Sequence, residues 1–208
     1  MMTLAGLRMA AAVSALATAH HDMAIVGETA GDASARELLL DRAFGPGRHL
    51  KTSARMRAGR LPADGLSLLA RSKGDAQMLG SVRLWAIALG NGRDGDGRAA
   101  LLLGPLGIAP EAQGVGVGGK LMRHAIAEAS FRGHAAILLV GDPDYYRRFG
   151  FLADHTTALR LPGPVEQRRF LGLELRPGAL SGARGLIRPT GAMAPIAAND
   201  AAACERAG

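Results

Sequence analysis

The sequence predicts an α/β fold in which helices flank a mixed, mostly antiparallel sheet that contains one parallel strand pair. Two apolar segments joined by a glycine-rich loop of the hairpin type, 90–97, should form antiparallel neighbours. Further on, an apolar strand, a glycine-dense loop, an amphipathic helix and a second apolar strand follow one another, which is the order of a parallel crossover. Only one such crossover is found, whereas a doubly wound domain repeats it.

The first part of the chain is predicted to begin with a short strand at 23–26 and a helix at 32–44. Asp32 can cap this helix, and a Gly-Pro-Gly segment ends it. A second, strongly basic helix is expected at 52–60, and an apolar strand follows at 66–70.

A long strand is predicted at 78–89, because apolar and other residues alternate there. In this segment Val82, Leu84 and Ala86 alternate with Ser81, Arg83 and Trp85. The strand that returns from it, 99–108, carries Gly104-Pro105 in its middle. A proline inside a strand indicates a bulge or an edge at that point.

The later elements form the crossover and the end of the sheet. Apolar residues keep helical spacing from Leu121 to Phe131, and Gly133 ends that helix. The elements expected after it are a buried strand at 135–140, a short helix at 143–148 that opens at Asp142-Pro143, and strands at 151–161 and 170–175.

Length and composition indicate one globular domain, which we place at 23–187. The chain has 208 residues, 48% of them hydrophobic, enough for a core that folds alone. No apolar run is long enough to span a bilayer, so no membrane partner is expected. The single cysteine, Cys204, excludes a disulfide within the chain and a cysteine-based metal site, and no metal is expected.

The two ends of the chain are expected to lie outside this domain. Residues 1–22 contain an Ala-rich stretch that loosely fits a secretory signal. We prefer to interpret this stretch as a dispensable, disordered leader, or as the result of a start assigned too early, with Met23 as the true beginning. The protein is accordingly expected to be cytoplasmic. The tail 188–208 is rich in Ala, Pro and Gly and is expected to be disordered.

The formal net charge of +7 raises the question of a nucleic-acid partner, but its distribution argues against one. The excess comes from arginines scattered along the chain, and only 4% of the residues are aromatic, which leaves few platforms for base stacking. No nucleic acid is therefore expected. The basic surface favours a polyanionic small cofactor.

The most informative segment is the glycine-dense loop 113–120, which lies between a strand and a helix. Glycines let the backbone approach a ligand closely, and the free N–H groups of a helix's first turn point at an anion. The loop therefore predicts a phosphate-binding site. Three classes of enzyme build such a loop, and its details decide between them.

A Walker A loop is the first possibility, with Gly114, Gly119 and Lys120 at the required spacing. Leu121 stands where the magnesium-binding Ser or Thr belongs, so this class fits poorly.

A dinucleotide-binding loop is the second possibility, with Gly114, Gly116 and Gly119 as its glycines and Asp142 as the ribose-binding acid. Such a loop should follow its strand directly, whereas here a spacer that contains Pro110 intervenes. The single crossover also disfavours this class.

The third possibility reads Gln113-x-x-Gly116-x-Gly118 as the unit. Over about 23–187 the chain resembles the Gcn5-related N-acetyltransferase (GNAT) superfamily, whose acetyl-CoA loop has the pattern Q/R-x-x-G-x-G/A. It is most similar to a bacterial subgroup that shares several further segments. They are Leu102 to Leu106 (LLGPL), Leu106 to Pro110 (LGIAP), Leu138 to Asp142 (LLVGD), Tyr145 to Phe151 (YYRRFGF) and Leu161 to Val165 (LPGPV).

The resemblance implies transfer of acetyl from acetyl-CoA to an amine by direct attack in a ternary complex. It also implies that the strand bulge lies where the family's parallel strands splay apart, leaving backbone groups free for the pantetheine arm. The cofactor-binding residues would be Leu106, Gly107 and Ile108 on the strand and Gln113, Gly114, Val115, Gly116, Val117, Gly118 and Gly119 in the loop.

The catalytic residue implied by the resemblance is Tyr146, which aligns with a family tyrosine beside the cofactor sulfur. A phenol with a pKa near 10 is suited to protonate a departing thiolate. The alternative is that Tyr146 only packs the short helix; Tyr145 is expected to be structural. No general base is identified, because His124, His134 and Asp142 each have a structural explanation and water can relay the proton.

The acceptor amine, a small molecule or a peptide, is not specified by the sequence, and neither is the oligomeric state. The segments 51–60 and 90–97 are expected to border its site. Arg55 and Arg57 either favour an acidic acceptor or form a solvated helix face, which is the preferred interpretation. The alternative functions are an acyl-CoA-binding regulator without turnover and a nicotinamide-dependent oxidoreductase.

Overall fold

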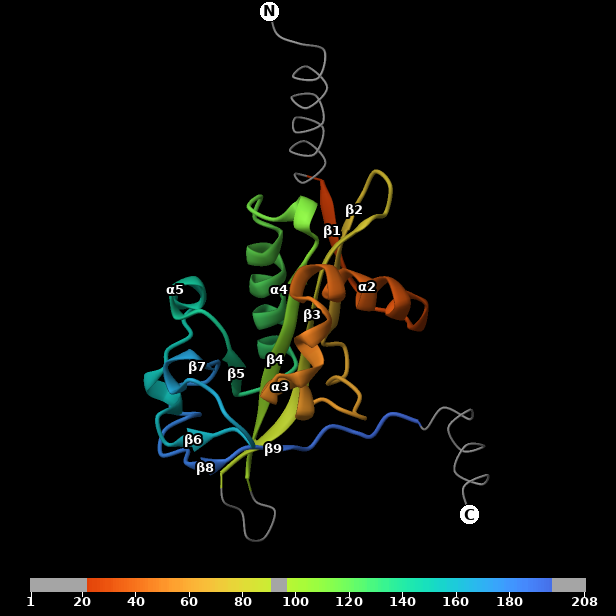
Figure 1. Cartoon of the computed structure of the whole chain (residues 1–208). Coiled ribbons are helices and arrows are strands. Elements are labelled where there is room, and N and C mark those ends of the chain that lie inside the picture. The colour runs from red at the N-terminus through yellow and green to blue at the C-terminus, as the bar shows by residue number, and fades with distance from the viewer. Residues whose placement is uncertain (1–21, 91–96, 196–208) are drawn as a thin grey trace, which may run out of the picture.

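The computed structural model describes residues 22–90 and 97–195, and Figure 1 shows the arrangement of its elements. The main sheet has the strand order β1-β2-β3-β4-β5-β7, with β9 added beside β3, while β6 and β8 pair separately. The strands are β1 (Met23–Gly27), β2 (Ser67–Ser72), β3 (Met78–Leu89), β4 (Arg98–Ile108), β5 (Ala136–Val140), β6 (Leu159–Arg160), β7 (Phe170–Glu174), β8 (Gly185–Leu186) and β9 (Arg188–Pro189).

Helices connect and cover these strands. The α-helices are α2 (Ala33–Phe44), α3 (Thr52–Arg55), α4 (Val117–Phe131) and α5 (Pro143–Tyr146). The short 3-10 turns are η1 (Ala30–Asp32), η2 (Pro46–Leu50), η3 (Pro110–Ala112), η4 (Arg147–Phe149), η5 (Asp154–Thr156) and η6 (Gln167–Arg169).

The main sheet is mixed, as predicted. Its neighbouring strands are antiparallel except for β4 and β5, which run parallel and are connected through α4. The fold class and the single strand–loop–helix–strand crossover are therefore confirmed.

The parallel pair diverges soon after it forms. Only Leu101 with Ile137 and Leu102 with Leu138 are paired across it. β4 continues to Ile108 beside β3, and β5 continues to its own end beside β7. Among the described residues no strand pairs with the β5 side of β4 beyond Leu102, so this edge of β4 is open.

A bulge in β4 marks the start of the open edge. Leu103 pairs with Leu84 and Leu106 with Val82, so Gly104 and Pro105 together face the single residue between those two partners. The indole Nε1 of Trp85 donates a hydrogen bond of 2.6 Å to the carbonyl oxygen of Gly104, which holds the bulged backbone in place. The bulge predicted from Gly104-Pro105 is confirmed.

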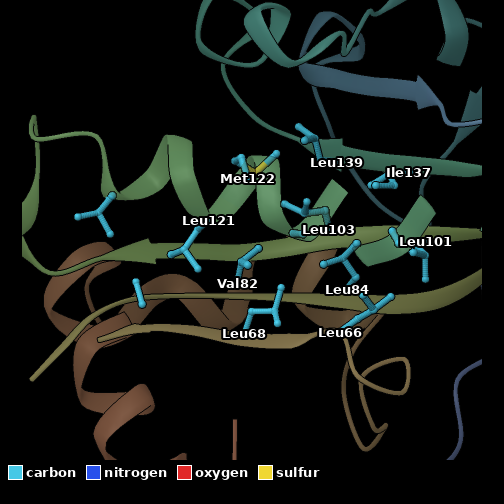
Figure 2. Close-up of a cluster of buried hydrophobic side chains, with 14 of the residues drawn as sticks. Leu66, Leu68, Val82, Leu84, Leu101, Leu103, Leu121, Met122, Ile137 and Leu139 are labelled. Carbon is cyan, nitrogen blue, oxygen red and sulfur yellow. The ribbon is translucent and has the colours of Figure 1, made fainter. Parts of the chain in front are cut away.

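The sheet is buried on both faces. On one face, Leu121 and Met122 of α4 belong to the same buried cluster as Val82 (Figure 2). On the other face α2 comes close to β4, because a Cβ atom at Gly107 would lie 2.6 Å from Cδ2 of Leu40. The packing of α2 and α4 therefore fixes β4 from both sides.

This two-sided burial corrects the predicted alternation of β3. The strand has the predicted bounds, and Val82 and Leu84 are buried, but Ser81 and Trp85 are buried too. Trp85 belongs to a second cluster that includes Ile187 from the C-terminal part of the chain. The local sequence does not reveal that this distant segment covers the second face.

Two predicted elements are shorter or absent. The basic helix at 52–60 ends at Arg55, and the chain then turns through Gly59, which has a positive φ of 65°. The strand at 151–161 is replaced by η5 and the two-residue β6. The hydroxyl of Thr156 donates to the carbonyls of Ala153 and Phe170, and these bonds favour a turn there over a strand.

Two further predictions also need correction. Asp32 precedes α2, but its carboxylate accepts hydrogen bonds from the backbone and hydroxyl of Thr29, both 2.8 Å, and pairs with Arg71 instead of capping α2. The disordered tail predicted from 188 does not begin there, because β9 pairs with β3 and Met193 bridges to Arg60. The predicted leader, most of the loop 90–97 and the tail beyond 195 lie outside the described residues.

Candidate active site

A cleft of about 750 Å³ lies beside the open edge of β4. Its lining comes from β4, the glycine loop and α4, the end of β5, α5 and the segment that includes η2 and α3. The predicted site residues that line it are Leu106, Ile108, Gln113, Gly114, Gly116, Val117, Gly118, Gly119 and Tyr146.

The glycine loop forms the N-terminal end of α4. Gly116 is the N-cap residue, with a left-handed φ of 89° and no side-chain cap, and Gly114 has a φ of 78°. A Cβ atom at either glycine would meet no heavy atom within 4 Å, so the loop backbone faces open space. A left-handed N-cap that leaves the first N–H groups of a helix facing open space is suited to bind a phosphate.

Two of the predicted cofactor residues do not line the cleft. Gly107 lies on the other face of β4, against Leu40 of α2. Val115 is exposed to solvent and is not among the lining residues. The strand therefore presents Leu106 and Ile108 to the cleft, while Gly107 allows α2 to approach closely.

The two tyrosines lie together at the cleft. Their rings meet edge to face at 4.9 Å, and Tyr146 also packs against Phe151. Burial raises the pKa of Tyr146 to about 12, with smaller contributions from Tyr145 and Asp142. The Tyr146 phenol is therefore protonated at neutral pH, and it is a weaker acid than the sequence led us to expect.

Tyr145, which was expected to be structural, also lines the cleft. Its hydroxyl would lie 2.9 Å from a Cβ atom at Gly118, so it lies at the first turn of α4. The guanidinium of Arg148 lies over its ring, 4.5 Å from the centroid, and burial raises the pKa of the Tyr145 phenol. Tyr145 and Arg148 thus form part of the wall near the glycine loop.

Of the three side chains considered as a general base, only Asp142 lines the cleft. Its carboxylate also caps α5 by accepting from the backbone N–H of Asp144 at 3.1 Å. His134 follows the far end of α4, about 20 Å from the glycine loop by the rise of a fifteen-residue helix. His124, in the middle of that helix, lies outside the lining.

Several basic residues of the lining were not identified from the sequence as members of the site. They are Arg48, His49, Arg148 and Arg169. Lys51 and Arg57 also line the cleft, and they belong to the segment that was expected to border the acceptor. These residues come from η2, α3 and the segments around α5 and η6, and no local motif connects them. Arg55 is exposed as expected, but Arg57 is half-buried at the cleft, so a solvated face is the wrong interpretation for Arg57.

In the two described ranges, no helix has the length and apolar character that a bilayer crossing requires. The same ranges contain no group of three or more His, Cys, Asp or Glu side chains arranged to hold a metal ion.

Comparison with known proteins gives clear relatives, although no family model matches the chain. Over 134 residues, 64% of this chain and 71% of the relative, it is 33% identical to the uncharacterized N-acetyltransferase YjhQ of Escherichia coli.

Two solved structures are similar across most of the chain. The GNAT family N-acetyltransferase YhbS from Escherichia coli, in complex with CoA, aligns with a TM-score of 0.67 and 26% identity over 81% of this chain and 90% of YhbS. A GNAT family acetyltransferase from Brucella melitensis, in complex with acetyl-CoA, aligns with a TM-score of 0.55 and 30% identity over 87% of this chain and all of that one.

The diverging strand pair and the cleft beside it are thus features of an acyltransferase. By the identity and coverage of these relatives, the chain belongs to the GNAT family of N-acetyltransferases.

Proposed function

We propose that the protein transfers acetyl from acetyl-CoA to an amine by direct attack in a ternary complex. The observation that carries the proposal is the open edge of β4 beside the N-terminal end of α4. Such an edge can pair with the amides of pantetheine, and the helix end can bind the pyrophosphate. The CoA complex of YhbS and the acetyl-CoA complex of the Brucella protein support this choice of donor.

In the proposed step, the neutral amine nitrogen attacks the carbonyl carbon of the thioester. The new C–N bond forms and the C–S bond breaks, so that the products are an N-acetyl amide and the CoA thiol. A backbone N–H of β4 near Leu106 or Ile108 stabilises the oxyanion. Tyr146 supplies the proton that the thiolate gains, the proton lost by the amine leaves to water, and Tyr146 regains a proton from water.

The experiment is a turnover screen with acetyl-CoA over small amines, peptides and aminoglycosides. Free CoA thiol and acetylated product are measured in the same reaction, and they should appear in equal amounts with at least one acceptor. Binding of acetyl-CoA without thiol release from any acceptor would favour the regulator that lacks turnover. Tighter binding of NAD than of acetyl-CoA would favour the oxidoreductase.

A further inference from the structure

A second cavity, of about 350 Å³, adjoins the cleft on the α2 side of the sheet. Arg48, His49, Ala54, Arg57 and Pro105 line both cavities, so the two meet at the bulge of β4. Apart from these shared residues, the second cavity is lined by charged and apolar side chains, which are Arg36, Glu37, Arg55, Arg83, Leu40, Ala58 and Trp85. A volume of this size suits a small molecule.

Most of the charges around this cavity neutralise one another. The carboxylate of Glu28 accepts from Arg36 and, at 2.7 Å, from Nε of Arg83. The carboxylate of Glu37 accepts from Arg48 and, at 2.6 Å, from Arg36.

Arg48 reaches a third carboxylate, because its Nε donates to Asp41 at 2.7 Å. Three arginines therefore face three carboxylates, and this part of the cluster carries no net charge.

Two more arginines line the cavity, Arg55, which is exposed to solvent, and Arg57, which is partly buried and adds a positive charge without an ion pair among the described residues. In the part of the chain that the structure describes, its guanidinium has no ion pair and no side-chain hydrogen bond. Burial and, next, the nearby charges of Arg48 and Arg83 lower its pKa to about 10, so it is still protonated at neutral pH. Glu37 opposes this shift, but its carboxylate is already paired with Arg36 and Arg48. A partly buried cation without an ion pair costs free energy that a bound anion offsets.

The position of Arg57 separates it from the phosphates of the donor. Its Nη1 would lie 3.4 Å from a Cβ atom at Gly104, so the guanidinium lies at the bulge. Gly104 is four residues before Ile108, about 13 Å along an extended strand, and the glycine loop lies further still. A thioester whose oxyanion is stabilised at Leu106 lies two residues from Gly104, about 7 Å along an extended strand, which places Arg57 near the reacting group.

We propose that the acceptor is a small amine that carries a carboxylate, and that Arg57 binds this carboxylate in the second cavity. The proposal rests on the proposed acetyl transfer and adds the class of its acceptor. A guanidinium matches a carboxylate with two parallel hydrogen bonds, and a monoanionic group balances the charge of Arg57. Leu40 and Trp85 lie where they can contact the carbon skeleton of such an acceptor.

The test compares pairs of acceptors that differ only in one group, amino acids and their carboxamides. For the wild-type protein, kcat/KM from thiol release should be higher for the carboxylate member by on the order of 30-fold, as expected for a buried charge pair. Arg57→Gln should remove this preference, and Arg57→Lys should restore part of it. Arg160→Gln, which removes an exposed arginine that lines neither cavity, should leave the preference unchanged.

The outcomes separate this inference from the acetyl transfer itself. If Arg57→Gln slows both members of each pair equally, Arg57 acts on the donor or the reacting carbonyl and the inference is overturned. It is also overturned if the wild-type protein binds acetyl-CoA but acetylates no amine that carries a carboxylate. Failure to bind acetyl-CoA at all would instead contradict the proposed function.

The melting temperature of the ligand-free protein tests whether Arg57 lacks a partner, and this test does not depend on enzymatic activity. Arg57→Met removes the uncompensated charge and keeps an apolar side chain, so the ligand-free variant should melt at or above the wild-type temperature. A markedly lower melting temperature would show that Arg57 makes a structural contact, and it would overturn the inference.

Discussion

Tyr146 occupies a confined position at the end of β5. A Cβ atom at Gly141 would lie only 2.1 Å from Cε2 of the Tyr146 ring, so the backbone there must be glycine for the ring to lie against it. Phe151 packs against the ring at 5.9 Å. The same packing that fixes the ring also removes the phenol from water, which is the main cause of its raised pKa.

Replacing Tyr146 with Phe tests its proposed role in catalysis, because the ring packing stays and only the hydroxyl is lost. We expect kcat to fall by about 10²-fold, the lower end of the range for general acid catalysis, since a pKa of about 12 makes proton donation less favourable. The dissociation constant of acetyl-CoA should barely change. A wild-type value of kcat in this variant would mean that Tyr146 only packs the short helix. A loss of kcat in Tyr145→Phe instead would assign the general acid to Tyr145.

The ionisation of the two phenols can be followed directly, because the chain has only two tyrosines. Tyrosinate absorbance should rise in two steps, the later near pH 12, and Tyr146→Phe should abolish the later step. An unfolded phenol ionises near pH 10, so above this pH the unfolded state binds fewer protons than the folded state. The free energy of unfolding should therefore fall more steeply between about pH 10 and 12 in the wild type than in Tyr146→Phe. Equal slopes would contradict the raised pKa.

At the scale of elements, the loop and α4 depend on backbone that only glycine adopts easily. Gly116 and Gly114 have positive φ angles and open space beside them, so the loop is shaped for close approach of a ligand and not for internal packing. Gly118 differs, because a side chain there would meet the Tyr145 hydroxyl. A substitution at Gly118 would therefore disturb the wall of the cleft as well as the phosphate site.

The substitution Gly116→Ala tests whether the glycine loop binds the phosphates of acetyl-CoA. A methyl group in the open space should weaken acetyl-CoA binding by about tenfold or more, about 1.4 kcal/mol. Gly178→Ala is the control, because Gly178 also has a positive φ, 78°, with open space and lies outside the cleft lining. Both variants should lose about 1–2 kcal/mol of stability through backbone strain, and only the first should lose affinity. Equal acetyl-CoA affinities, measured by calorimetry, would show that the loop is not the site.

Local patterns in the sequence predict these elements well where each pattern has a single structural solution. The hairpin, the crossover and the Gly104-Pro105 bulge all follow from turn chemistry or from proline in a strand. The strand predicted at 151–161 is wrong because the hydroxyl bonds of Thr156 depend on the distant carbonyl of Phe170. Patterns in the sequence cannot reveal such long-range partners.

At the scale of the molecule, the site is assembled from parts that are distant in the sequence. The glycine loop and the tyrosine helix carry recognisable motifs, and both line the cleft. The arginines around the second cavity come from α2, η2, α3, the segment after α3, and β3, and each resembles an ordinary surface charge in its local sequence. The net charge of +7 predicted an anionic ligand, but only the fold shows that Arg57 is partly buried at the second cavity without an ion pair among the described residues.

The central claim is that the open edge of β4 and the glycine loop bind acetyl-CoA, and ligand-dependent unfolding tests it most directly. With acetyl-CoA at about 100 times its dissociation constant, the free energy of unfolding should rise by about 2.7 kcal/mol, while NAD and ATP at the same concentration should change it little. A larger stabilisation by NAD or ATP than by acetyl-CoA would contradict the account.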